Sequence, residues 1–259
     1  TQLALSDVVA KRIPFMADAE LRKSINTHKA LYMDQHLSET HEMLNNKHFP
    51  KVNTALIEAS SIDAEGNIIP TTSVGNSATF AALADEIIIE VNSAFPLEFN
   101  GIHDIYIPTA YPNREAVNVT HVDTRIGTNY IKVDPSKVVA VVLTNKPDAP
   151  AVISAPDEVT SGISRHITEF FNKEVAEGRL TKSLMPLQAG IGKIANAVLS
   201  GLVHSDFEDL VMYSEVLQDS TFELIDSGKM KFASTTSITI SQECYDNFIN
   251  NFDQYKDKI

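Results

Sequence analysis

The sequence contains no tryptophan and only one cysteine among its 259 residues. That single thiol, Cys244, excludes an internal disulfide and suits a reducing compartment. The sequence also lacks an apolar run of the roughly 20 residues that a transmembrane helix needs, and residues 1–20 lack the apolar core of a signal peptide. We therefore expect a cytoplasmic protein, or one of the mitochondrial matrix in a eukaryote, with no membrane partner.

Basic residues are scarce. The 21 lysines and arginines are outnumbered by 34 aspartates and glutamates, which gives a net charge of −13. This balance argues against binding to nucleic acid or to an anionic membrane, because both need a basic face. It does not exclude a small anionic ligand, because a few local hydrogen-bond donors are enough to bind one. An initiator methionine is also absent, so Thr1 is expected to be a processed, trimmed or mid-protein start.

Hydrophobic residues make up 43% of the chain, enough for a sizeable core, and strand-like runs alternate with helix-like ones. This order predicts an α/β fold built from parallel βαβ units. The polar segment 17–46 is helix-prone, and a polar excursion covers 95–136. We interpret the proline-rich segment 145–158 as a linker between two domains of related build, 1–150 and 151–259. The expected strands are 52–60, 87–92, 137–144, 184–188, 209–213 and 231–239, and the expected helices are 77–86, 160–177, 193–203 and 216–226.

A glycine loop opens the expected helix 193–203, in the stretch PLQAGIGKIANAVLSGLV (186–203). Gly190 and Gly192 let the backbone approach a ligand, and the free N–H groups of the helix start would point at it. Such a site favours an anion or a developing oxyanion. A phosphate-binding P-loop is excluded, because Leu187 stands where its first glycine belongs and Ile194 where its serine or threonine belongs.

The same loop also fits a dinucleotide-binding fingerprint. Gly190-x-Gly192-x-x-Ala195 matches G-x-G-x-x-G/A, and Glu215 lies 20 residues beyond Ala195, where such folds keep a ribose-binding acid. Spacing alone therefore leaves open an NAD-dependent oxidoreductase.

Glu215 lies in DLVMYSEVLQDS (209–220), where an expected buried strand is followed by an expected helix. A carboxylate at this place has a structural explanation in the helix dipole. The alternative is that it does chemistry, because the carboxyl ends of strands face the ligand crevice of an α/β sheet. The residues alone leave both interpretations open.

Several segments together resemble the acetyl-CoA hydrolase/transferase family, the class I CoA-transferase group that includes succinyl-CoA:acetate CoA-transferases. They are VGNSATFAALADEIIIEVNSAFP, GIHDIYIP, HVDTRIGTNYIKVDPSKVVAVV, PLQAGIGKIANAVLSGL and MYSEVLQDSTFELIDSGKMKFASTTS. The resemblance implies that Glu215 is the nucleophile. It also implies that the loop of Gln188, Ala189, Gly190, Ile191 and Gly192 binds coenzyme A, with the Ile191 N–H in an oxyanion hole. Lys193 departs from the asparagine of typical members, which puts a side-chain role there in doubt.

The implied activity is CoA transfer from an acyl-CoA to a carboxylate of the acetate or succinate class, through a glutamyl-CoA thioester. Hydrolysis on the same scaffold is an alternative. Coenzyme A enters as acyl-CoA substrate, no metal is required, and a homodimer is expected. Because family members are nearly twice as long, the chain is expected to be a fragment. It would lack the first segment, a later glycine-rich segment and part of the second domain.

Other polar residues have structural interpretations that we prefer. Glu90 could be a second catalytic acid but is better explained as a hydrogen-bond acceptor. Cys244 and the serines lack the surroundings of a nucleophile. Solvated or fold-stabilising roles are the default for Lys182, Lys193, His121 and Asp123. The clustered histidines do not have the spacing of a metal motif; they are His28, His36, His41 and His48.

Overall fold

The computed structural model describes residues 5–6, 8–13, 18–148 and 155–259. The middle of the expected linker, 149–154, lies outside them. The chain divides into two compact units, Thr1–Lys51 with Pro108–Arg114, and Val52–Ile107 with Glu115–Ile259. No described helix is long and apolar enough to span a bilayer.

The first unit is small. Its strands β1 (Lys11–Arg12) and β2 (Leu31–Tyr32) pair in parallel, and helix α2 (Ala19–Asn26) lies between them in sequence. The Asp18 carboxylate begins α2 by accepting a hydrogen bond from the Leu21 N–H at 2.9 Å. The segment 17–46, expected to be helix-prone, ends with the 3₁₀ turn η1 (Leu37–Glu39) and helix α3 (Thr40–Asn45).

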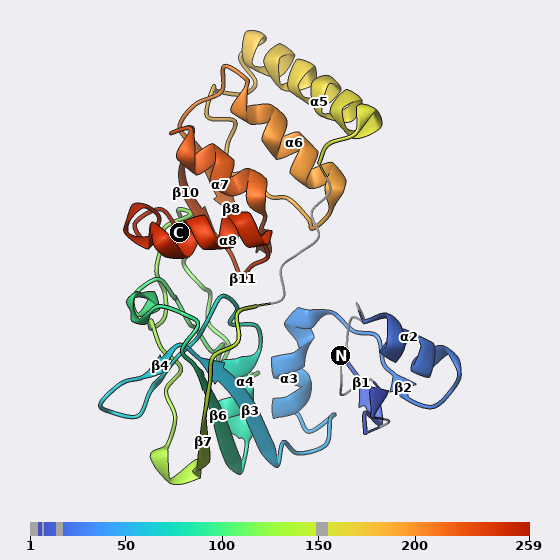
Figure 1. The fold of residues 1–259 in the computed structure, drawn as a ribbon, viewed down its shortest axis with the longest axis vertical. Helices are drawn as coiled ribbons and strands as arrows, with labels where there is room; N and C mark the ends of the chain where they lie inside the picture. The colour runs from blue at the N-terminus through green and yellow to red at the C-terminus, as the bar shows by residue number, and fades with distance from the viewer. Residues whose placement is uncertain (1–4, 7, 14–17, 149–154) are drawn as a thin grey trace. The chain divides into compact units, whose positions relative to one another are not determined.

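The second unit contains a parallel sheet of order β3-β6-β7. Its strands are β3 (Thr54–Ala59), β6 (Glu86–Asn92) and β7 (Val138–Thr144), and helix α4 (Ser77–Leu83) connects the first two. Side chains alternate along β3, so Ala55 and Ile57 point into a core that also holds Ile87 and Ala81. Small alanines on α4 allow it to lie close to the sheet (Figure 1). The expected α/β fold with parallel-rich sheets is confirmed.

Strand β7 is unusual for a parallel strand, because five of its seven residues are exposed. It ends the sheet, and its sequence VVAVVLT has neither charge nor proline. Leu143 alone keeps 80% of its surface accessible. Parallel strands are normally covered on both faces by other elements. The described residues leave the apolar side chains of β7 exposed instead.

The irregular connections of this unit hold short elements. They are the antiparallel pair β4 (Ser61–Ile62) and β5 (Ile68–Ile69), and the 3₁₀ turns η2 (Leu97–Phe99) and η3 (Pro135–Lys137). Gly66 sits in the β4–β5 turn with φ of 86°, a conformation that favours glycine.

The C-terminal segment of the same unit is a second α/β arrangement. Strands β8 (Leu210–Tyr213) and β10 (Met230–Ser234) pair in parallel, as do β9 (Val216–Leu217) and β11 (Ser237–Ile238). The order of helices is α5 (Glu158–Ala176), α6 (Lys193–Val203), α7 (Asp219–Asp226) and α8 (Gln242–Asn250), followed by the 3₁₀ turn η4 (Phe252–Gln254). Helix α6 contacts both α5 and α7 (Figure 1). The core includes Leu199, Leu210, Phe222 and Phe248.

Three expected elements differ from the structure. The expected strand 184–188 is reduced to one parallel bridge between Leu187 and Met212. Leu184 and Met185 have φ of 63° and 82°, which no strand accommodates, and Pro186 supplies no N–H.

The expected helix 216–226 starts only at Asp219, because Val216 and Leu217 pair with β11 instead. The expected strand 231–239 is divided into β10 and β11, and Thr235 and Thr236 turn between them.

Helices α5 and α6 approach closely at Gly201, and this contact gives a stability prediction. A Cβ built at Gly201 would lie 2.0 Å from the Ser164 Oγ, whereas one built at Gly162 on α5 meets nothing within 4 Å. We expect Gly201→Ala to lower the free energy of unfolding by about 1–3 kcal/mol through overpacking. The matched Gly162→Ala should raise it by up to about 1 kcal/mol. Urea denaturation measures both, and equal effects would contradict the predicted contact.

Candidate active site

Glu215 lies between β8 and β9 and is held by its backbone. Its carbonyl oxygen accepts hydrogen bonds from the N–H groups of Thr236 and Ser237 at 3.1 and 3.2 Å. It also accepts from the hydroxyls of Thr235 and Thr236, both at 2.8 Å. The side chain is exposed, and within the described part of the chain its carboxylate has no hydrogen bond or ion pair. The fold therefore uses the main chain of Glu215 and leaves its carboxylate available.

Two buried side chains on either side of Glu215 attach the glycine loop to this segment. The Ser214 hydroxyl donates to the Ala189 carbonyl at 2.9 Å and accepts from the Ala189 N–H at 3.3 Å. The Gln218 amide accepts from the Gly192 N–H at 3.0 Å and donates to the Gly190 carbonyl at 3.2 Å. Both side chains are less than a tenth exposed. Four side-chain hydrogen bonds therefore join the loop to the segment that carries Glu215.

The loop itself faces outward. Gln188, Gly190, Ile191 and Gly192 are exposed, and Ala189 is half-buried. Gly192 directly precedes the first residue of α6 and has a φ of 133°. Glycine adopts this conformation readily, whereas other residues adopt it only with strain. Among the described residues, the Ile191 N–H has no hydrogen-bond partner. An N–H in this state is free to donate to an anion or an oxyanion.

Lys193, which departs from the asparagine that the resemblance implies, forms an ion pair that joins two helix starts. Its Nζ lies 3.3 Å from the Oδ2 of Asp157, the residue that caps α5. The Thr160 N–H and hydroxyl, followed by Lys193, lower the pKa of the Asp157 carboxyl to about 2. Asp157 therefore stays ionised at neutral pH, and its contribution to stability is lost only as the pH falls from about 4 towards 2.

The other residues weighed from the sequence have structural partners or unsuitable surroundings. Glu90 accepts a hydrogen bond from the Thr144 hydroxyl at 2.8 Å. Burial, with the nearby carboxylate of Asp219, raises the pKa of the Cys244 thiol, so the thiolate that a nucleophile needs is disfavoured. Lys182, His121 and Asp123 are exposed. Within the described ranges, no three histidine, cysteine, aspartate or glutamate side chains gather into a metal site.

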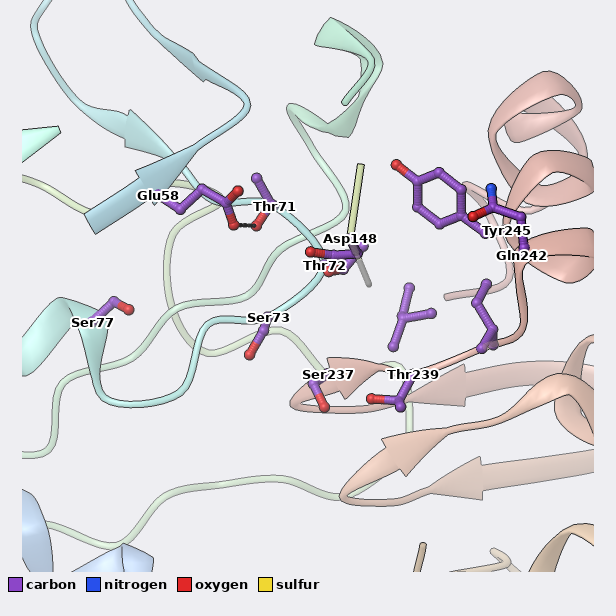
Figure 2. A pocket seen from close by; sticks show the side chains of 12 residues that line it. Glu58, Thr71, Thr72, Ser73, Ser77, Asp148, Ser237, Thr239, Gln242 and Tyr245 are labelled. Atoms are coloured by element: carbon purple, nitrogen blue, oxygen red, sulfur yellow. Dashed lines mark hydrogen bonds between the residues drawn. The ribbon is translucent and has the colours of Figure 1, made fainter. Parts of the chain in front are cut away.

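The sequence did not predict a polar cavity of about 530 Å³ in the second unit (Figure 2). Its carboxylates already have partners: Glu58 accepts from the Thr71 hydroxyl at 2.9 Å, and Asp148 accepts from the Thr72 hydroxyl at 2.8 Å. Burial and the neighbouring acids raise the pKa of Tyr245 to about 12. The signal in the sequence is the pair of hydroxyl-rich runs around 71–77 and 235–239, which lie far apart in the chain. Neither Glu215 nor the glycine loop lines this cavity.

A family model described as the acetyl-CoA hydrolase/transferase N-terminal domain matches residues 1–143. The chain belongs to the acetyl-CoA hydrolase/transferase family. Curated relatives agree with this assignment. The chain is 42% identical to a succinyl-CoA:acetate CoA-transferase of Clostridium kluyveri, across 99% of this chain and 48% of that protein. It is also 42% identical to an acetyl-CoA hydrolase of Schizosaccharomyces pombe, across 98% of this chain and 50% of that protein. The chain thus spans about half the length of the curated relatives it matches.

Solved structures support the fold of this family member. RipA from Yersinia pestis superposes with a TM-score of 0.61 at 17% identity, covering 92% of this chain and 50% of that one. A 4-hydroxybutyrate CoA-transferase from Porphyromonas gingivalis superposes with a TM-score of 0.60 at 20% identity, covering 93% of this chain and 53% of that one. At these identities the likeness concerns the fold.

Proposed function

We propose that this family member supplies the nucleophile and one oxyanion donor for CoA transfer between an acyl-CoA and a small carboxylate. The observation that carries the proposal is the connection of Glu215 to the glycine loop through Ser214 and Gln218. The Glu215 carboxylate and the Ile191 N–H, both without a partner among the described residues, thereby belong to one hydrogen-bonded segment. One relative is a succinyl-CoA:acetate CoA-transferase, and a carboxylate nucleophile with a nearby N–H donor can serve that chemistry.

In the proposed reaction, the Glu215 carboxylate attacks the thioester carbonyl. The tetrahedral oxyanion collapses to a mixed anhydride and releases CoA thiolate. The thiolate attacks the glutamyl carbonyl, which gives glutamyl-CoA and a free carboxylate. A second carboxylate then reverses these steps and leaves as the new acyl-CoA. Each step passes through an oxyanion that the Ile191 N–H can stabilise, and one such donor is typically worth about 3–4 kcal/mol.

The test is capture of the intermediate. The full-length gene product is incubated with acetyl-CoA and digested, and the peptide that contains Glu215 is examined by mass spectrometry. We expect that peptide to carry covalently bound CoA. Active transfer with CoA attached to another residue would refute the role of Glu215.

Acetyl-CoA hydrolysis is the second candidate, because other relatives are named for it. It differs only in the acceptor, since water would attack the glutamyl-CoA thioester in place of a second carboxylate, which releases free CoA and restores the Glu215 carboxylate. Product analysis with and without added acetate separates the two: hydrolysis releases free CoA without acetate, whereas transfer from succinyl-CoA yields acetyl-CoA.

An NAD-dependent oxidoreductase is less well supported by the geometry. The strand that should precede the dinucleotide loop is reduced to the single Leu187–Met212 bridge. In a calorimetric titration we expect binding of CoA and none of NAD. Binding of NAD without CoA would overturn the proposed function.

The glycine loop gives a matched pair of substitutions. A Cβ at Gly190 or at Gly192 would face open space, but only Gly192 has φ in the left-handed region. We expect Gly192→Ala to cost about 1–3 kcal/mol of stability through backbone strain. It should also weaken CoA binding at least tenfold, which is about 1.4 kcal/mol.

Gly190→Ala serves as the control, because it adds the same atom without that strain. It should lower CoA affinity with a smaller loss of stability. A folded Gly192→Ala protein with unchanged CoA affinity would count against the loop as the CoA site.

The remaining expectations continue as parts of this proposal. They are the division into domains 1–150 and 151–259, a homodimer, a cytoplasmic or mitochondrial-matrix location, and a reaction that needs no metal.

A further inference from the structure

Gln218 is a buried amide whose two ends are both used by the glycine loop. It keeps only 3% of its surface exposed and lies directly before α7. Its Oε1 accepts from the Gly192 N–H and its Nε2 donates to the Gly190 carbonyl. The side chain does not cap its own helix, although its position would allow it. Its hydrogen bonds are therefore directed at the loop and not at the local secondary structure.

The two bonds bracket Ile191 in a way that fixes one peptide plane. The Gly190 carbonyl and the Ile191 N–H belong to the same planar trans peptide group and point in opposite directions. When Gln218 holds the carbonyl, the Ile191 N–H must point away from Gln218. That is the N–H without a partner in the described residues. The bond to the carbonyl also polarises the amide, which strengthens the N–H as a donor.

We propose that Gln218 is the positioning residue for the oxyanion donor. It orients the Gly190–Ile191 peptide so that the Ile191 N–H is presented to the reacting carbonyl, without touching substrate itself. This inference rests on the proposed function. It adds a residue that neither the motif nor the resemblance assigned.

The first test is Gln218→Met in the full-length gene product, assayed for CoA transfer from succinyl-CoA to acetate. Methionine has a similar length but makes neither hydrogen bond. We expect kcat to fall about 10²–10³-fold, as when an oxyanion donor is lost. The KM for succinyl-CoA should change less than about threefold, because the donor acts mainly in the transition state.

The matched control is Asn196→Ala on α6. Asn196 is also a buried amide, and its Oδ1 accepts from the Ser220 N–H at 3.2 Å. Its backbone N–H donates to the Gly192 carbonyl at 3.0 Å, a bond that the substitution keeps, whereas no bond of its side chain to the loop is present among the described residues. The control should lose comparable stability in thermal denaturation but keep kcat within about threefold of the wild type. An equal loss of kcat in both variants would overturn the inference, as would a Gln218→Met protein in which KM rises while kcat is unchanged.

Gln218→Glu decides the question if the methionine variant does not fold. The carboxylate keeps the size of glutamine and can still accept from the Gly192 N–H, but it places an oxygen against the Gly190 carbonyl. We expect kcat to fall at least about 10²-fold; a retained kcat would overturn the inference. A wild-type protein without CoA-transfer or thioester-hydrolysis activity would instead refute the proposed function, so the two failures are distinguishable.

Discussion

Glu215→Gln should reduce CoA transfer at least about 10⁴-fold, because removal of a catalytic nucleophile typically costs this much or more. The amide is nearly the same size as the carboxylate but cannot attack a thioester. The fold should persist, since four donors hold the Glu215 carbonyl oxygen and not its side chain. Steady-state transfer from succinyl-CoA to acetate measures the loss, and circular dichroism checks the fold.

Glu208→Gln is the matched control for this substitution. Glu208 is exposed and lies two residues before β8, as Glu215 lies two residues after it. The control should transfer CoA at the wild-type rate. Normal turnover in Glu215→Gln, or an equal loss in the two variants, would refute the assignment of Glu215 as nucleophile.

The 259-residue chain by itself should transfer CoA at least about 10³-fold more slowly than the full-length gene product, because its site is open to water. Glu215 and most of the loop are exposed within the residues described. Electrostatic catalysis depends on several donors in a pocket that excludes water, and a hydrated carboxylate is a poor nucleophile. The curated relatives are about twice as long as this chain, so they have the residues to enclose such a pocket.

The comparison uses both proteins at equal molar concentration in the same assay of transfer from succinyl-CoA to acetate. A folded chain, established by circular dichroism, is the precondition for the comparison. Comparable rates would show that an enclosed pocket is not needed and that the oxyanion account is wrong.

The sequence predicted well the elements whose signals are local. Gly192 followed by an amphipathic run predicted α6 with the bounds that the structure has, Lys193–Val203. The strand-like runs 52–60 and 87–92 likewise predicted β3 and β6. These elements follow from side-chain periodicity and from the backbone freedom of glycine, which a single sequence displays.

The errors arose where tertiary contacts override local preference. The residue types of Leu184 and Met185 do not indicate that their φ angles are positive. Val216 and Leu217 suit a helix start or a strand, and pairing with β11 decides for the strand.

The polar contacts of the candidate site were equally beyond prediction. Ser214 and Gln218 reach backbone atoms 25 to 28 residues away, and such bonds exist only once the chain is folded. The sequence therefore supplied Glu215 and the loop as candidates, but not the side chains that join them.

Strand β7 has a consequence for how this chain behaves during folding. A terminal strand that has neither charge nor proline, and that the described residues leave uncovered, is a template on which the same strand of another molecule can pair; natural proteins usually block such edges. Intermolecular pairing is second order in protein, whereas folding is first order. The yield of refolded 259-residue chain should therefore fall as its concentration rises, and a lysine at an exposed β7 position should restore it.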